Sequence, residues 1–206
     1  SHYLPNGQVF RPGCTPYPGL ALPLLAALTP DDFDVEIVDD YHEDAELDRP
    51  CDLVGISAMT PQAPRAYSIA DAFRGRGTKV IIGGFHASLM PEEAGEHADA
   101  VIIGEADESW PQAVEDFRQG RLKPLYKASG LADLSKLPTP RYELVRKYRH
   151  SLRVWPVQTT RGCPMDCEFC SVRQFFGRSY RHRPVEDVVR DIKATGSKYI
   201  FFVDDN

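Results

Sequence analysis

The stretch Lys79-Val80-Ile81-Ile82-Gly83-Gly84 decides the fold class of this chain. Its apolar residues are continuous rather than alternating, which is typical of a strand that is covered on both faces, as in a parallel sheet. Three further runs of the same kind are Val35–Val38, Leu53–Ser57 and Ala100–Glu105. The sequence therefore predicts several buried strands in series.

Helical segments separate or flank these runs. Residues 66–73 and 110–117 have apolar side chains at i, i+3 or i+4, and i+7, which marks one face of a helix. A short apolar helix is also expected at Leu20–Leu28. Strand–helix–strand units in series predict an α/β fold, a Rossmann-like doubly wound parallel sheet with right-handed crossovers.

The carboxyl ends of the predicted strands form a candidate ligand site, because ligands bind beyond these ends in doubly wound sheets. The small or polar residues at these ends are Ser57, Thr60, Gly83, Gly84, Gly104 and Glu105. Glycine lets a bulky ligand approach the backbone. The alternative for each glycine is that it only ends a strand.

Composition excludes several classes of protein. The 206 residues have a formal net charge of −6, which argues against nucleic acid as the main partner, because phosphate binding needs a concentrated basic surface. No transmembrane segment or signal peptide is expected, since no apolar run approaches the roughly 20 residues that span a bilayer. Three of the five cysteines lie within eight residues, which favours metal ligands over disulfides. The sequence thus predicts a cytoplasmic protein.

A second strand–helix–strand pattern follows residue 150. It consists of a predicted strand at Leu152–Thr159, a helix at Pro184–Ala194 and a strand at Tyr199–Val203. Two strands and one helix cannot close a barrel, so we expect the chain to be a fragment. The predicted organisation is a ligand-binding domain at 1–125, a linker at 126–150 and the start of a second domain at 151–206.

A cysteine loop follows the first strand of that second domain. Cys163, Cys167 and Cys170 have the spacing C-x3-C-x2-C, and thiolates this close can hold one soft metal centre. On a [4Fe-4S] cluster, three thiolates leave one iron open to another ligand. A structural zinc site, the alternative, would need a fourth ligand, and neither His150 nor His182 has a regular spacing to the cysteines.

The cysteine loop resembles the signature of the radical S-adenosylmethionine (SAM) superfamily, including the aromatic Phe169 before the last cysteine. The resemblance implies that SAM chelates the open iron and yields a 5'-deoxyadenosyl radical, with Phe169 near the adenine. It also implies a one-electron reductant, such as flavodoxin or ferredoxin, as a partner. Asp204 stands where the family has a motif that contacts the methionine amino group, although the common Gly-Gly-Glu form is missing here.

The wider layout resembles the subgroup of this superfamily with an N-terminal cobalamin-binding domain. The similar stretches are Gly55–Thr60, Gly83–His86, Gly104–Ala106, Leu137–Arg141 and Phe202–Asn206. The resemblance implies cobalamin along the carboxyl edge of the sheet, with its nucleotide tail near Ser57 and Gly83-Gly84.

One motif departs from the pattern of cobalamin domains. Domains that supply a histidine to the cobalt use D-x-H-x-x-G, whereas here Asp40-Tyr41-His42 is followed by alanine at position 45. We therefore predict that His42 is a surface loop residue and that cobalamin binds without histidine ligation. His86 lies nearer the expected edge, and a structural role is an equal alternative for it.

These features predict a cobalamin-dependent radical SAM enzyme, most simply a methyltransferase that acts on an unactivated carbon of a small-molecule or lipid-like substrate. Segments such as Arg181–Pro184 resemble the hopanoid methylases of the subgroup. The alternatives are a non-methylating enzyme, such as an anaerobic porphyrin ring cyclase, or a module that only binds cobalamin. No side chain is assigned as catalytic, and the chain alone is expected to be inactive.

Two further groups of residues have open interpretations. The basic stretch Arg173–Arg183 could bind anionic groups of SAM or substrate, or could bond to neighbouring loops. Cys14 and Cys51 have no partner pattern, so we expect both to be buried as small apolar residues.

Overall fold

The computed structural model of the chain describes residues 2–3, 9–10, 18–148 and 154–205. The loop expected at residues 1–18, including Cys14, and the first residues of the strand expected from Leu152 lie largely outside the described residues, as does His150. The chain divides into two compact units, which are taken in turn. The first consists of Ser1–Gly13 and Glu43–Ser129, and the second of Cys14–His42 and Gly130–Asn206.

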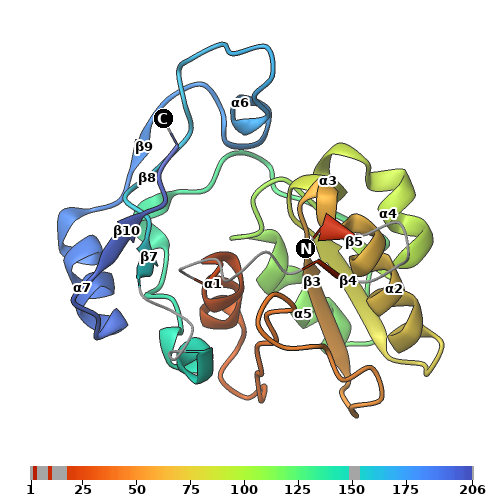
Figure 1. The fold of residues 1–206 in the computed structure, drawn as a ribbon. Helices are drawn as coiled ribbons and strands as arrows, with labels where there is room; N and C mark the ends of the chain where they lie inside the picture. The colour runs from red at the N-terminus through yellow and green to blue at the C-terminus, as the bar shows by residue number, and fades with distance from the viewer. Residues whose placement is uncertain (1, 4–8, 11–17, 149–153, 206) are drawn as a thin grey trace. The chain divides into compact units, whose positions relative to one another are not determined.

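The first unit is built on a four-stranded parallel sheet (Figure 1). In spatial order its strands are β3 (Leu53–Ser57), β4 (Lys79–Gly83), β5 (Ala100–Ile103) and β6 (Leu125–Lys127). The register places Val54 beside Val80 and Ile82 beside Val101. The strands predicted from the three apolar runs after residue 50 are confirmed.

Helices cover both faces of this sheet. They are α2 (Ala63–Arg74), α3 (Phe85–Leu89), α4 (Pro91–His97) and α5 (Ser109–Arg118), with a short 3-10 helix, η1 (Thr60–Gln62), before α2. On one face Tyr67 of α2 belongs to a core with Val80 and Val101. On the other face the Trp110 indole of α5 lies against Gly55, so close that a Cβ there would be 2.6 Å from it. The two covered faces confirm the doubly wound α/β arrangement.

The second unit contains two small sheets and several short helices. Its elements are α1 (Ala21–Leu28), η2 (Leu134–Lys136), η3 (Tyr142–Tyr148), β7 (Trp155–Val157), β8 (Thr160–Arg161), α6 (Val172–Phe176), β9 (Arg181–His182), α7 (Val185–Thr195) and β10 (Ile200–Phe202). Strands β7 and β10 are parallel, with α7 between them in sequence, which confirms the second strand–helix–strand unit. Strands β8 and β9 form an antiparallel ribbon. A further two-stranded ribbon, β1 (His2–Tyr3) with β2 (Val9–Phe10), belongs to the first unit.

Two segments differ from the sequence-based expectation. Val35–Val38 is not a strand, and the prediction there is wrong. Ile37 is instead buried in a core with Ala26 and Tyr142 of the second unit, so its burial does not come from a sheet ladder. Residues 126–150, predicted as a linker, include part of β6 and the buried side chains of η3, among them Val145.

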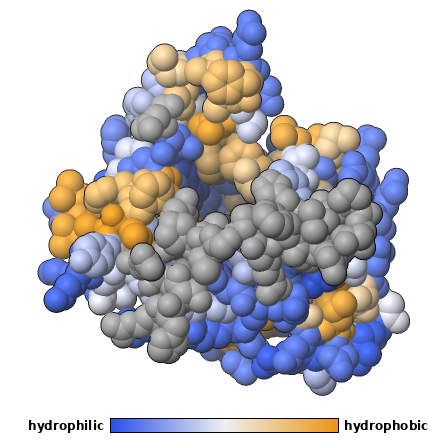
Figure 2. Space-filling view, viewed as in Figure 1, coloured by the Kyte–Doolittle hydropathy of each residue, from blue (hydrophilic) through white to orange (hydrophobic). Residues whose placement is uncertain are grey.

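Helix α7 shows an unexpected division of its faces. The predicted apolar stripe is at the surface at Val185 and Val189, whereas Asp191 and Thr195 are buried. Tyr199, Phe201 and Phe202, in or next to β10, are also exposed, and apolar residues gather at the left of Figure 2 over the position of α7 and β10. Within the described part of the chain, no helix is long and apolar enough to cross a bilayer.

Candidate functional site

The carboxyl edge of the first unit's sheet is held together by backbone contacts between β3 and β4. The Ala58 amide donates to the Gly83 carbonyl over 3.3 Å, and the His86 amide donates to the Ala58 carbonyl over 3.2 Å. Gly84 has φ +93°, and a Cβ on it would lie 2.9 Å from the Ala58 oxygen and 3.0 Å from the Ser57 hydroxyl. Only glycine fits this position, because it combines the close approach with a backbone conformation that L side chains rarely adopt.

Ser88 links this edge to the end of β5, and sequence reasoning missed it. Its hydroxyl donates to the Gly84 carbonyl over 2.8 Å and accepts from the Gly104 amide over 2.9 Å. Gly104 itself has φ +78° and open space where a Cβ would lie. The fixed spacing of Gly84 and Ser88, one helical turn apart, is the signal that could have revealed the link.

The remaining predicted edge residues are Thr60 and Glu105. The Thr60 hydroxyl lies 3.4 Å from Nδ1 of His86, while Nε2 of His86 lies 2.8 Å from the Tyr67 hydroxyl. His86 is buried with both ring nitrogens engaged, which favours its structural interpretation. Burial, followed by Glu93, raises the pKa of Tyr67 to about 12, so its hydroxyl stays protonated at neutral pH. Glu105 is buried next to Gly104.

His42 lies in the second unit, and its side chain is not at the surface. The imidazole is 4% exposed and stacks on Tyr148 with ring centroids 5.0 Å apart. The prediction of a surface residue is therefore wrong, because Tyr148, more than one hundred residues later, covers the ring. Cobalamin binding without histidine ligation stays a prediction.

The cysteine loop of the second unit has a closed base. Strands β8 and β9 pair at Arg161 and Arg181, and the Cys163 amide donates to the Gly177 carbonyl over 3.3 Å. Gly162 has φ +93°, and a Cβ there would lie 2.3 Å from the Ser179 carbonyl oxygen. The loop therefore leaves and returns through a narrow neck just before Cys163.

The three cysteines differ in exposure. Cys163 is buried at the neck, Cys170 is half-buried and Cys167 is exposed, with the Cys170 amide donating to the Cys167 carbonyl over 3.1 Å in a tight turn. Their thiols do not converge: among the described residues, no group of three or more His, Cys, Asp or Glu side chains could already hold a metal ion. The donor chemistry of three thiols on one loop nevertheless fits an iron–sulfur cluster. Phe169 is 93% exposed on the same turn.

Asp204 and Asp205 follow β10 and contact the start of the cysteine loop. The Asp204 carboxylate accepts hydrogen bonds from the Thr159 amide and hydroxyl, both at 2.6 Å, and from the Thr160 amide at 2.9 Å. Asp205 accepts from the Gly162 amide at 3.0 Å. Burial raises the pKa of Asp205, and the hydrogen bond from Gly162 opposes part of that rise.

The basic stretch after the cysteines is engaged with protein groups at three positions. Arg173 pairs with Asp166 inside the loop, and this guanidinium holds the pKa of Asp166 below its ordinary value. Arg181 donates to the carbonyls of Ala132 and Phe176, at 2.8 and 3.0 Å. Arg183 and Asp191 form an ion pair at 2.5 Å with both side chains 1% exposed. These contacts favour bonding to nearby protein groups, in loops and in α7, over ligand binding for the three arginines.

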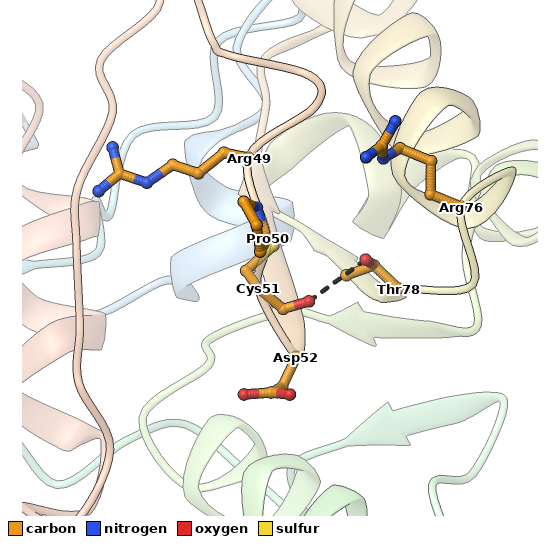
Figure 3. A pocket seen from close by; sticks show the side chains of 6 residues that line it. All are labelled: Arg49, Pro50, Cys51, Asp52, Arg76 and Thr78. Atoms are coloured by element: carbon orange, nitrogen blue, oxygen red, sulfur yellow. Dashed lines mark hydrogen bonds between the residues drawn. The ribbon is translucent and has the colours of Figure 1, made fainter.

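A separate pocket of about 360 Å³ lies at the opposite, amino end of β3 and β4 (Figure 3). The residues that line it are Arg49, Pro50, Cys51, Asp52, Arg76 and Thr78. The Thr78 hydroxyl donates to the Cys51 carbonyl over 3.3 Å. Cys51 is exposed, so the expectation of burial is wrong. The pocket is distinct from the predicted ligand edge, because the strands are parallel and run away from it.

Comparison with known families matches both units. The family described as "B12 binding domain" matches residues 15–114, and the "Radical SAM superfamily" matches residues 157–206. The chain belongs to the radical SAM proteins that contain a B12-binding domain.

Relatives of this radical SAM chain include named methyltransferases. The bacteriochlorophyllide d C-8(2)-methyltransferase of Chlorobaculum tepidum is 37% identical over 188 residues, which are 88% of this chain and 42% of that protein. The hopanoid C-2 methylase of Rhodopseudomonas palustris is 27% identical over 92% of this chain and 37% of that protein. The radical SAM chain thus spans less than half the length of these relatives.

Solved structures agree on the fold. The radical SAM methyltransferase TsrM of Kitasatospora setae, with cobalamin and a [4Fe-4S] cluster bound, matches with a TM-score of 0.70 at 17% identity, over 96% of this chain and 46% of that chain. The cobalamin-dependent SAM radical enzyme OxsB matches with a TM-score of 0.63 at 20% identity, over 78% and 26% of the two chains. The fold of this radical SAM chain is therefore a Rossmann-like parallel sheet, followed by a strand–helix–strand region at the residues that match the radical SAM superfamily.

Proposed function

We propose that this chain supplies the cobalamin site and the cluster loop of a radical SAM methyltransferase that acts on an unactivated carbon. The observation that carries the proposal is the presence, in one chain, of a small-residue sheet edge and a three-thiol loop. The sheet edge lies within the match to the B12 binding domain, at residues 15–114, and the loop within the match to the radical SAM superfamily, at residues 157–206. When bound, the cluster with SAM would supply a carbon-centred radical, and cobalamin would supply a transferable methyl group.

The cobalamin site in this proposal is the carboxyl edge of the first unit. It comprises Ser57, Thr60, Gly83, Gly84, Gly104 and Glu105. The link from Gly84 through Ser88 to Gly104 fixes the ends of β4 and β5 relative to each other. Because side chains are small there, a broad ligand can contact backbone groups directly.

The cluster site in this proposal consists of Cys163, Cys167 and Cys170. The closed neck fixes the backbone at Cys163, while Cys167 is exposed and Cys170 half-buried on the turn that follows. Phe169 on that turn is available to contact the adenine of SAM. A one-electron donor such as flavodoxin or ferredoxin would reduce the cluster in the cytoplasm.

The test is anaerobic reconstitution of the chain with iron and sulfide, followed by metal analysis and titration with hydroxocobalamin. We expect about four irons per chain, as in a [4Fe-4S] cluster, and one bound cobalamin. Cobalamin binding without iron would support a module that only binds cobalamin. Binding of neither cofactor would overturn the proposal.

The second candidate is a radical enzyme with the same two cofactors that does not methylate, such as a ring cyclase. The relatives favour methyl transfer, since both the bacteriochlorophyllide and the hopanoid enzymes are named for it. The same comparison supports a small-molecule or lipid-like substrate. Transfer of label from methyl-labelled SAM to product by the full-length protein separates the two candidates, and we expect the isolated chain to be inactive.

A further inference from the structure

The parallel ladder of β7 and β10 ends in a side chain rather than in another strand residue. Its last rung is the Val203 amide, which donates to the Val157 carbonyl over 3.0 Å. Past this point the Thr159 and Thr160 amides both donate to Oδ1 of Asp204, at 2.6 and 2.9 Å. The carboxylate thus takes the place of a strand carbonyl where the chain turns away into β8.

The second oxygen of Asp204 is also engaged. Oδ2 accepts a hydrogen bond from the Thr159 hydroxyl at 2.6 Å. Three bonds from two consecutive residues orient the carboxylate toward the loop base, and carboxylates bind backbone amides strongly in this way. Turning Asp204 toward the amino group of a ligand would leave these donors without their acceptor, which is costly where they are shielded from water.

Asp205 contacts the backbone of the loop slightly further along than Asp204 does. Its Oδ2 accepts from the Gly162 amide at 3.0 Å, and Gly162 immediately precedes Cys163. Ser179 and Phe176 crowd Gly162 from the returning side of the loop. The first cysteine therefore starts from a backbone position that is fixed from two sides.

We propose that Asp204 and Asp205 are positioning residues that hold the neck of the cysteine loop, and that Asp204 does not itself contact SAM. This inference rests on the proposed function, because it assigns the cluster to the same three cysteines. Its consequence is that the hydrogen-bond acceptors of Asp204 matter more than its charge, because an uncharged oxygen can still accept from both amides.

Three substitutions distinguish a positioning role of Asp204 at the loop neck from direct contact with SAM. Asp204→Asn keeps an oxygen that can accept from both amides but removes the charge that would attract a ligand ammonium group. Asp204→Ala removes charge and acceptors together. Thr159→Val keeps the shape of Thr159 and removes only its hydroxyl. Asp133→Ala is the control, because Asp133 likewise accepts from a backbone amide, but from that of Ser135 in η2 and not from Thr159 or Thr160.

The first measurement is amide hydrogen exchange of the cofactor-free chain. We expect exchange at Thr159, Thr160 and the loop after them to become about tenfold faster in Asp204→Ala, since a lost charge-assisted hydrogen bond costs roughly that factor or more. Asp204→Asn should stay within about threefold of the wild type, and Thr159→Val should lie between the two. Unchanged exchange in Asp204→Ala would overturn the proposal, whether or not the chain takes up a cluster.

The second measurement is iron content and SAM affinity after anaerobic reconstitution. We expect Asp204→Ala to lose more than half of its iron, and Asp204→Asn and Asp133→Ala to retain wild-type iron and SAM affinity. If Asp204→Asn binds iron normally but loses SAM affinity tenfold, Asp204 is a ligand and the proposal is wrong. If Asp204→Ala does not fold, Asp204→Asn and Thr159→Val still decide between the roles. A wild-type chain without iron would defeat the proposed function alone, because the exchange experiment tests the neck separately.

Discussion

The two units close the carboxyl ends of their parallel strands with different chemistry. In the first unit the closing groups are neutral: backbone amides, the Ser88 hydroxyl and the bare backbone of Gly84. In the second unit they are the carboxylates of Asp204 and Asp205. An edge of mostly small residues, with Glu105 as the one carboxylate among those predicted, suits direct contact with a broad ligand. In the second unit two carboxylates instead hold a loop whose own side chains are the proposed ligands.

The buried interiors of the two units also differ in whether they contain a buried ion pair. The first unit's main core is apolar, with Ala70, Val80 and Ile82 almost fully inaccessible. The second unit buries the Arg183–Asp191 ion pair beside its apolar cluster. Removing one partner of such a pair leaves an uncompensated buried charge. The first unit also buries the carboxylates of Glu105 and Asp116, but the cations that pair with Asp116 are exposed. The largest loss of stability from removing one charge is therefore expected at the Arg183–Asp191 pair.

The largest expected effect is the loss of the cluster from Cys163→Ala. Removing one of three thiolates from the loop should lower the reconstituted iron from about four per chain to below one. Iron analysis and the absorbance of the brown protein measure this change. Cys51→Ala is the control and should keep its iron, because Cys51 lies in the first unit, in the pocket at the amino end of the sheet. Equal iron in both variants would contradict the assignment of the loop.

The next effect tests the buried pair. Asp191→Ala should destabilise the second unit by about 3–5 kcal/mol, because Arg183 would remain charged and buried. Trp155 is the tryptophan of this unit and Trp110 that of the other, and the chain has no third. Urea unfolding followed by Trp155 fluorescence in a Trp110→Phe background therefore reports on the second unit.

The matched control lies on the same helix. Asp187 pairs with Arg190 at 2.7 Å, but Arg190 is 53% exposed. Asp187→Ala should therefore cost about 0.5 kcal/mol or less, as surface pairs do. Similar losses of unfolding free energy for Asp187→Ala and Asp191→Ala would show that burial of the pair does not increase its contribution to the stability of this unit.

The third effect tests shape in the first unit. Gly84→Ala should cost about 3 kcal/mol, because it combines a positive φ with a contact of 2.9 Å to the Ala58 oxygen. Gly77→Ala is the comparison, since Gly77 has φ +89° but open space around its Cβ position, and should cost only about 1–2 kcal/mol. Thermal unfolding and cobalamin titration measure both variants, and we expect weaker cobalamin binding only for Gly84→Ala.

Local patterns predicted the parts of the fold that depend on near neighbours. The runs that became β3, β4 and β5 are apolar and end in small residues, and the helices between them have the apolar repeat of a buried face. The cysteine spacing likewise predicted the loop, since all three thiols lie within one turn-rich segment. These features are encoded within about ten residues each.

The differences arise where the partner is distant in sequence. Val35–Val38 has the composition of a strand, but Ile37 packs with residues of η3 about one hundred positions later. His42 is covered by Tyr148 for the same reason. The resemblance implied that Asp204 contacts the methionine amino group of SAM, which no observation here tests. Its bonds to Thr159 and Thr160, about 45 residues earlier, join two segments and could not be read from either one alone.

The smallest expected effect is the acid response of Asp99 in the first unit. Asp99 accepts from Lys79 Nζ at 2.7 Å and from the Val80 amide at 2.9 Å. Burial alone raises the pKa of Asp99, but these two hydrogen bonds together with the positive charges of Lys79 and Arg74 outweigh it and hold the pKa below its ordinary value. A lowered carboxyl pKa adds stability that is fully present above the unfolded-state value of about 3.9 and is lost as the pH falls through the lower, folded-state value.

Asp99→Asn isolates this contribution. Because Lys79 is 54% exposed, the loss at pH 7 should be only about 0.5–1 kcal/mol. The difference between wild type and variant should be constant above about pH 5 and should shrink below about pH 4, the ordinary range of an aspartate. Urea unfolding at several pH values, followed by Trp110 fluorescence in a Trp155→Phe background, checks this. A difference that grows on acidification would mean that Asp99 is stabilised in its protonated, uncharged form, and would contradict its stabilising ion pair with Lys79.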